Sequence, residues 1–202
     1  MKNLLIKLFF YIIGLVTISL GVTLTIKADL GAGAWDALNV GLTESFGLTV
    51  GTWVIIIGAV LIISNALISK SRPDLLAVLT ILVLGKMIDF WMSAFAEMSM
   101  NSWIAQLVLL LAGILVIAFG VSLYIQPQFS INPVDGFMVA LQKRFGLSLT
   151  AAKTLTETFA FIFAFTLGGP IGVGTFIILL GIGPAIHFFD HRAQKAMKRM
   201  LS

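Results

Sequence analysis

Six long apolar runs, separated by short stretches that contain polar residues, glycine or proline, set the pattern of this chain. A helix needs about 20 apolar residues to cross the ~30 Å hydrocarbon core of a bilayer. The runs have about this length, so the pattern predicts six transmembrane helices in an all-α membrane protein. Their approximate bounds are Leu8–Ile26, Thr52–Ile68, Leu75–Phe95, Trp103–Ile125, Leu149–Leu167 and Val173–Phe189.

The basic residues predict how these runs are oriented, because lysine and arginine are retained on the cytoplasmic side of short loops. They cluster before the first run, after the second, after the fourth and after the sixth, whereas the other connections are poor in cations. Six crossings of a bacterial inner membrane with both termini cytoplasmic satisfy every connection, and five would leave one terminal cluster outside. The clustered cations are Lys2, Lys7, Lys70, Arg72, Lys143, Arg144, Arg192, Lys195, Lys198 and Arg199.

Composition supports the membrane prediction and excludes other classes of protein. The chain is 59% hydrophobic and only 11% charged, which leaves too little polar surface for a soluble globule of 202 residues. A net charge of +4 could indicate nucleic-acid binding, but the 13 Lys and Arg residues form no basic stripe. The absence of cysteine excludes disulfides, thiolate metal sites and cysteine nucleophiles.

The two halves of the chain resemble each other at a shift of 99 residues. Chance similarity between apolar sequences would explain one hexapeptide, but the agreement continues through a polar loop. Because each half carries three spans, the second half enters the membrane from the opposite side, as in inverted-repeat transporters. We therefore expect one transmembrane domain over residues 1–202, with repeats at about 8–97 and 103–190 and a cytoplasmic basic tail at 191–202. The matching segments are Gly21–Ile26 with Gly120–Ile125, Asp36 with Asp135, and Phe46–Thr49 with Phe145–Ser148.

One polar segment follows the first span of each half, at Asp29–Phe46 and Gln128–Phe145. Each is too long for a tight turn and too polar for a lipid-facing span. In both, a break containing glycine or proline precedes an aspartate and an apolar helical pattern, which predicts a short re-entrant or interfacial helix. Asp36 and Asp135 fall in its first turn, where a carboxylate caps free N–H groups or faces a cavity as a binding group. The pattern leaves both interpretations open.

Ionisable residues inside spans are costly and need a partner, water or a route to the interface. Lys86 and Asp89 are three residues apart in the third span, and Lys153 and Glu157 are four apart in the fifth. A self-neutralising pair buried between helices is the simpler account of Lys86 with Asp89. Glu157 is better explained as a functional residue, because Lys153 lies nearer the interface and can extend its amine away from it.

The chain resembles the YczE/YyaS/YitT group of bacterial integral membrane proteins, and the YczE-like members most. The resemblance implies a membrane protein of this shape over the whole chain and supplies no substrate and no catalytic residue. It is carried by Lys27-Ala28-Asp29-Leu30-Gly31 and Trp35-Asp36-Ala37-Leu38 within Gly21–Gly47, by Asn132-Pro133-Val134-Asp135-Gly136, and by Gly183-Pro184-Ala185-Ile186.

These observations favour a small secondary transporter or permease with its site between the halves. A slight excess of carboxylates over lysines there suggests a cationic or amine-bearing solute, or proton coupling. The expected substrate-binding residues are Asp36, Asn39, Asn132, Asp135 and Glu157, with Lys86, Asp89 and Lys153 as gating or counter-charge groups.

Two other functions compete with this one. A non-transporting accessory or scaffold protein would hold a partner through its span surfaces. An enzyme is disfavoured, because hydrolase, metalloprotease and P-loop motifs are absent. His187 and His191 with Asp190 are a weak metal motif, so we expect no metal, no cofactor and no nucleic acid, and the lipid bilayer with a small solute or proton as partners.

Overall fold

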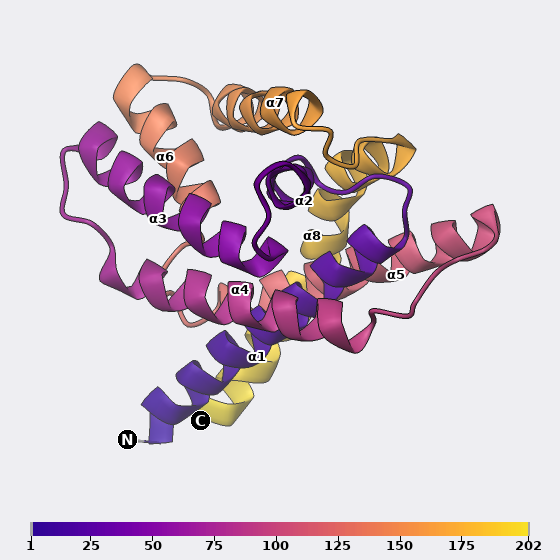
Figure 1. Ribbon diagram of the computed structural model, residues 1–202. Helices are drawn as coiled ribbons and strands as arrows, with labels where there is room; N and C mark the ends of the chain where they lie inside the picture. The colour runs from indigo at the N-terminus through magenta and orange to yellow at the C-terminus, as the bar shows by residue number, and fades with distance from the viewer. Residues whose placement is uncertain (1, 202) are drawn as a thin grey trace.

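The computed structural model describes residues 2–201, and this part of the chain forms eight α-helices and no strand (Figure 1). The prediction of an all-helical protein is confirmed, as are the two short helices that follow the first run of each half. The last residue of the predicted basic tail, Ser202, lies outside the described residues. The helices are α1 (Lys2–Lys27), α2 (Ala34–Phe46), α3 (Val50–Ser69), α4 (Leu75–Ala94), α5 (Trp103–Tyr124), α6 (Pro133–Phe145), α7 (Leu149–Thr166) and α8 (Val173–Leu201).

Five of these helices are long and apolar enough to cross a membrane, namely α1, α3, α4, α5 and α8. The remaining predicted span, the fifth in the chain, forms α7, which has 18 residues and falls outside this group. Its polar side chains are the reason, since α7 carries Lys153, Glu157 and several threonines.

The helices pack as two layers. In one layer α1 packs against α4 and α5, and α5 packs against α8; in the other α3 packs against α6, and α7 packs against both α2 and α6. Figure 1 shows α3, α6 and α7 above α1, α4 and α5, with α2 viewed nearly along its axis. The main contact between the layers is that of α3 with α4, whereas α7 and α8 scarcely touch.

Glycines bring α1 and α5 together at the centre of the first layer. A Cβ atom on Gly14 would lie 2.6 Å from the Tyr124 backbone nitrogen, and one on Gly21 would lie 2.6 Å from that of Ile117. On the facing helix, Gly113 and Gly120 are as tightly enclosed. Small residues let helix backbones approach closely inside a membrane, so packing explains the seven-residue glycine spacing of both helices.

The α3–α4 contact between the layers also depends on glycine. A Cβ atom on Gly51 or on Gly85 would collide with the carbonyl oxygen of the other residue, so the two backbones are in direct contact. Two turns further along α3, a Cβ atom on Gly58 would lie 2.5 Å from the Ile81 side chain. No larger residue fits at these positions without separating α3 from α4.

Backbone hydrogen bonds attach the start of α2 to the loop between α7 and α8. The Ala32 N–H donates to the Pro170 carbonyl at 2.9 Å, and the Gly174 N–H donates to the Leu30 carbonyl at 2.6 Å. Gly31 lies between them with a φ of 103°, a conformation that glycine adopts without strain. The loop therefore fixes the N-terminus of α2 beside the gap between α7 and α8.

Candidate functional site

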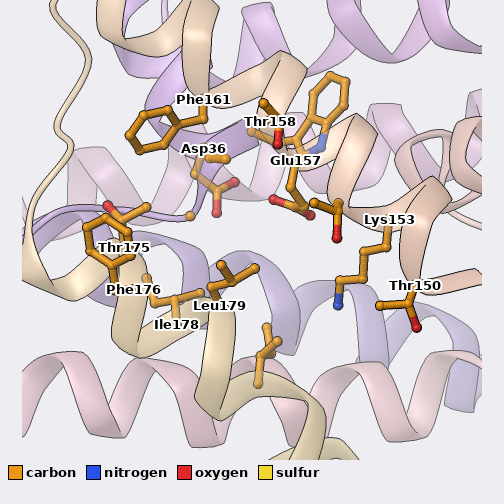
Figure 2. Close-up of a pocket in the computed structure, with 15 residues that line it drawn as sticks. Asp36, Thr150, Lys153, Glu157, Thr158, Phe161, Thr175, Phe176, Ile178 and Leu179 are labelled. Atoms are coloured by element: carbon orange, nitrogen blue, oxygen red, sulfur yellow. The ribbon is translucent and has the colours of Figure 1, made fainter.

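A cavity of about 550 Å³ lies between α7, α8 and the N-terminus of α2 (Figure 2). It occupies the gap left because α7 and α8 do not pack against each other. Three charged residues line it, Asp36, Lys153 and Glu157, within walls that are mainly apolar. The remaining lining residues are Gly33, Ala34, Trp35, Thr150, Thr154, Thr158, Phe161, Thr175, Phe176, Ile178, Leu179 and Ile182.

One face of α7 supplies most of the polar groups of the cavity. Lys153 and Glu157 are one turn apart, and Thr150, Thr154 and Thr158 follow the same four-residue spacing. Residues three or four apart share a helix face, so these side chains form a single polar stripe. Ala160 and Ala164, which follow Glu157 along the same side of the helix, pack on α2.

Asp36 faces the cavity and caps no helix. The N-cap residue of α2 is Gly33, which has no side chain to cap with, and no group within residues 2–201 donates a hydrogen bond to the Asp36 carboxylate. The carboxylate folds back over this N-terminus, because its Oδ2 atom lies 3.1 Å from the position of a Cβ on Gly33. Capping is therefore not its role in this structure, although the positive end of the α2 dipole favours its charge.

The carboxylates of Asp36 and Glu157 are turned toward the same space, and the Lys153 side chain extends into the cavity beside them. Asp36 and Glu157 repel each other electrostatically, whereas Glu157 is attracted to Lys153. Lys153 also attracts Asp135, an exposed residue of α6 beside Tyr124. Four charges contributed by α2, α6 and α7 thus form one interacting group.

Of the five residues expected to bind substrate, two line the cavity, Asp36 and Glu157. Asp135 interacts with the cavity's lysine from outside the lining. Asn39 is 5% exposed and lies one turn further along α2, outside the cavity lining.

Asn132 is the N-cap residue of α6 and lies outside the cavity lining. Its side chain accepts a hydrogen bond from the Val134 N–H at 3.2 Å, and its own N–H donates to the Tyr124 hydroxyl at 3.4 Å. Asn132 therefore takes the capping position that the sequence had offered to Asp135, because proline follows it and begins the helix.

The buried pairing of Lys86 with Asp89 is wrong, because Lys86 is exposed. Asp89 instead holds the start of α3. One of its oxygens accepts from the Gly51 N–H at 2.8 Å and the other from the Thr49 hydroxyl at 2.7 Å. Asp89 is thus placed at the contact between the two layers.

The threonines of the cavity and its aromatic walls, Trp35, Phe161 and Phe176, were not among the site residues predicted from the sequence. A signal was available for part of this set. Threonine at positions 150, 154 and 158 repeats at helical spacing around Lys153 and Glu157, inside a run that is otherwise apolar. A polar stripe on a membrane helix indicates a face turned away from lipid.

Comparison with known proteins places the chain in a group without an assigned activity. Residues 5–191 match the model of a family of unknown function, DUF6198. The chain belongs to this family. It is 33% identical to the uncharacterized protein YyaS of Bacillus subtilis (strain 168) over 184 residues, which cover 91% of this chain and 92% of YyaS.

Two further relatives are similar over most of their length. The uncharacterized membrane protein YczE of the same Bacillus strain is 30% identical over 188 residues, which cover 93% of this chain and 86% of YczE. An uncharacterized protein of Haemophilus influenzae (strain ATCC 51907 / DSM 11121 / KW20 / Rd) is 28% identical over 173 residues, 85% of this chain and 78% of that protein. No solved structure matches. The predicted resemblance to the YczE and YyaS proteins is confirmed, and this is an integral membrane protein.

Proposed function

We propose that this protein is a small secondary transporter of the bacterial inner membrane. It crosses the membrane six times as two inverted halves, α1–α4 and α5–α8, and carries a cationic or amine-bearing solute through the cavity between α7, α8 and α2. Asp36 and Glu157 bind the solute, and Lys153 is their counter-charge.

The packing of the helices supports two equivalent halves. When each helix is replaced by its counterpart in the other half, the contact of α1 with α4 becomes that of α5 with α8, and the contact of α2 with α3 becomes that of α6 with α7. In the same way, the contact of α2 with α7 becomes that of α6 with α3. All six of these contacts occur. Asp36 and Asp135 match as well, since each is the third residue of a 13-residue helix.

The positions of the chain ends support an even number of crossings. The N-terminal end of α1 and the C-terminal end of α8 lie side by side (Figure 1), and Ile6 and Phe10 share a cluster with Met197. Ends that meet on one side of a membrane require an even number of spans, which makes α7 the sixth. Its polar stripe then faces the cavity, the alanines that continue this side of the helix pack on α2, and its exposed apolar side chains meet lipid.

The observation that carries the proposal is a difference between the halves at their corresponding helix pairs α3–α4 and α7–α8. The α3–α4 pair is closed by Gly51 and Gly58, whereas the residues 99 positions later are Thr150 and Glu157, which are too large for the same contact. The corresponding α7–α8 pair is open and contains the charged cavity. One closed and one open gap between the same layers is the arrangement expected of a carrier open to one side.

Movement of one layer against the other would expose the cavity alternately to each side. Asp89 would act as a gate residue, because its hydrogen bonds close the α3–α4 pair. On the open side, a Cβ on Gly183 would have no atom within 4 Å, which leaves room for α7 to approach α8. Lys86, exposed on α4, stays a candidate counter-charge.

Uptake by proteoliposomes tests this function. The full chain would be reconstituted and exposed to radiolabelled monoamines and diamines of graded chain length, with and without a pH gradient. We expect saturable uptake of at least one amine, and its loss by about tenfold or more in both Asp36→Asn and Glu157→Gln, because each variant removes a charge from the cavity. Asp29→Asn and Glu97→Gln are matched controls, since both residues are exposed and lie outside the cavity lining.

A non-transporting accessory protein is the alternative function. Proteoliposomes that hold folded protein but accumulate none of the amines and show no proton flux would favour it over transport. Uptake that is equal in wild type, Asp36→Asn and Glu157→Gln would remove this cavity from the mechanism.

A further inference from the structure

The cavity offers its ligand an excess of negative charge at one end. Two carboxylates and one ammonium line it, and the ammonium, that of Lys153, interacts with Glu157 and Asp135. Asp36 receives neither a hydrogen bond nor a cation from the residues described. A buried carboxylate without a partner favours a positively charged ligand beside it.

The apolar walls of the cavity indicate which class of cation it can bind. Trp35, Phe161 and Phe176 contribute rings, and Ile178 and Leu179 of α8 extend the apolar surface. About 550 Å³ is far more than an inorganic ion fills and lies within the range of sites for organic ligands. Carboxylates set among aromatic rings suit a cation that is attached to an apolar body.

The hydroxyl groups of the cavity lining indicate which kind of organic ammonium it binds. Thr150, Thr154 and Thr158 line the cavity from α7, and Thr175 lines it from α8. Hydroxyl oxygens accept hydrogen bonds from N–H groups. A primary ammonium carries three such donors and a quaternary ammonium carries none, so this lining favours the primary form.

Lys153 already presents a primary ammonium to the cavity on a flexible stem, and it has two anionic neighbours. A ligand that bound between Asp36 and Glu157 would release Lys153 from Glu157. The lysine could then turn toward Asp135, which lies outside the cavity lining. Asp135, the counterpart of Asp36 in the repeat, then affects ligand binding through Lys153 and not by contacting the ligand itself.

We propose that the cavity binds a protonated primary amine on an apolar body, with the ammonium of the ligand between Asp36 and Glu157. The Lys153 ammonium competes with the ligand for Glu157, and Asp135 weakens this competition by attracting Lys153. This deepens the proposed transport function and rests on the same site. Two sources carry this chemistry, a free organic amine and the phosphatidylethanolamine headgroup of the surrounding bilayer.

Calorimetric titration of the full chain in phosphatidylcholine nanodiscs tests the proposal, with empty discs as the blank. The probe is n-hexylammonium, compared with hexan-1-ol, hexanoate and methylammonium. We expect saturable binding of n-hexylammonium with a Kd at least about tenfold below that of the other three, because only this probe has both a positive charge and an apolar chain. Equal affinity for hexan-1-ol would overturn the proposal, since the cavity would then be merely apolar.

The lysine and Asp135 provide the sharper test. Lys153→Met should tighten n-hexylammonium binding by about threefold or more, because the internal competitor is removed. Asp135→Asn should weaken binding while Lys153 is present and have no effect in the Lys153→Met background. Misfolding cannot imitate a gain in affinity, and Lys143→Met, at an exposed position on α6, is the matched control. Weaker binding by Lys153→Met would overturn the competitor role.

A change in the lipid of the nanodiscs distinguishes a free amine from the phosphatidylethanolamine headgroup as the natural ligand. If phosphatidylethanolamine occupies the cavity, the apparent Kd for n-hexylammonium rises when this lipid replaces phosphatidylcholine, in wild type but not in Asp36→Asn. If the ligand is a free amine, the Kd is the same in both lipids. Binding without uptake would support the ligand class and contradict transport, whereas uptake of a solute without an amine would keep transport and overturn the ligand class.

Discussion

The carboxylate of Asp89, near the end of α4, accepts a hydrogen bond from the Gly51 N–H at the start of α3, with a distance of 2.8 Å. The first N–H groups of a helix have no partner within the helix, so the bond satisfies a group that would otherwise be left open. Because α3 and α4 belong to different layers, the same bond joins the layers at their main contact. In the proposed mechanism, the α3–α4 contact that this bond stabilises is closed while the gap between α7 and α8 is open.

Replacing Asp89 should loosen this contact. Asp89→Ala removes the acceptor of both the Gly51 N–H and the Thr49 hydroxyl, and we expect a loss of about 1–3 kcal/mol in the free energy of unfolding in detergent. Hydrogen exchange of the amides at the start of α3 should accelerate with it. Asp29→Asn alters an exposed carboxylate and should change neither. Unchanged exchange at Gly51 in Asp89→Ala would mean that the bond does not hold the layers together.

A matched pair of glycines tests whether the two gaps differ as described. Gly85 of α4 and Gly183 of α8 correspond in the repeat when one residue is removed from the 99-residue shift, which also aligns Gly85–Phe90 with Gly183–Phe188. A Cβ on Gly85 collides with α3, whereas a Cβ on Gly183 has no atom within 4 Å. Gly85→Ala should therefore destabilise the protein by about 1–3 kcal/mol through overpacking. Gly183→Ala should be neutral or stabilising by up to about 1 kcal/mol, because alanine favours the helix.

Thermal unfolding of the two purified alanine variants, measured in the same detergent, compares them directly. A lower Tm for Gly85→Ala alone agrees with a closed α3–α4 pair and an open α7–α8 pair. Equal destabilisation by the two substitutions would indicate that α7 and α8 are packed as closely as α3 and α4.

The helices were predictable because each depends on a local pattern. Apolar runs of membrane length gave the long helices, and the break before Asp36 and before Asp135 gave α2 and α6. The role of α7 was harder to predict, since Lys153 and Glu157 make it the least apolar of the predicted spans. Hydropathy does not distinguish a crossing helix with a polar stripe from one that lies outside the membrane.

The site was only partly predictable, because it depends on which helices separate. Asp36 could be selected as a carboxylate at the start of a short helix and Glu157 as a charge inside an apolar run, and both line the cavity. Asn132 could not be separated from them by residue type, although the proline after it is typical of a helix cap. The difference that opens the cavity was present in the sequence as Thr150 and Glu157 against Gly51 and Gly58. Its meaning became clear only when the contacts between layers were known.

The inverted arrangement of the halves is the central claim, and the sidedness of two equivalent residues tests it most directly. Glu44 and Lys143 lie 99 positions apart, both exposed and near the ends of α2 and α6. Because the chain has no cysteine, Glu44→Cys and Lys143→Cys each carry a single thiol for a membrane-impermeant maleimide. In intact cells we predict labelling of Glu44→Cys, and labelling of Lys143→Cys only after the membrane is permeabilised. Labelling of both thiols from the same side would contradict the inverted repeat and the transport mechanism built on it.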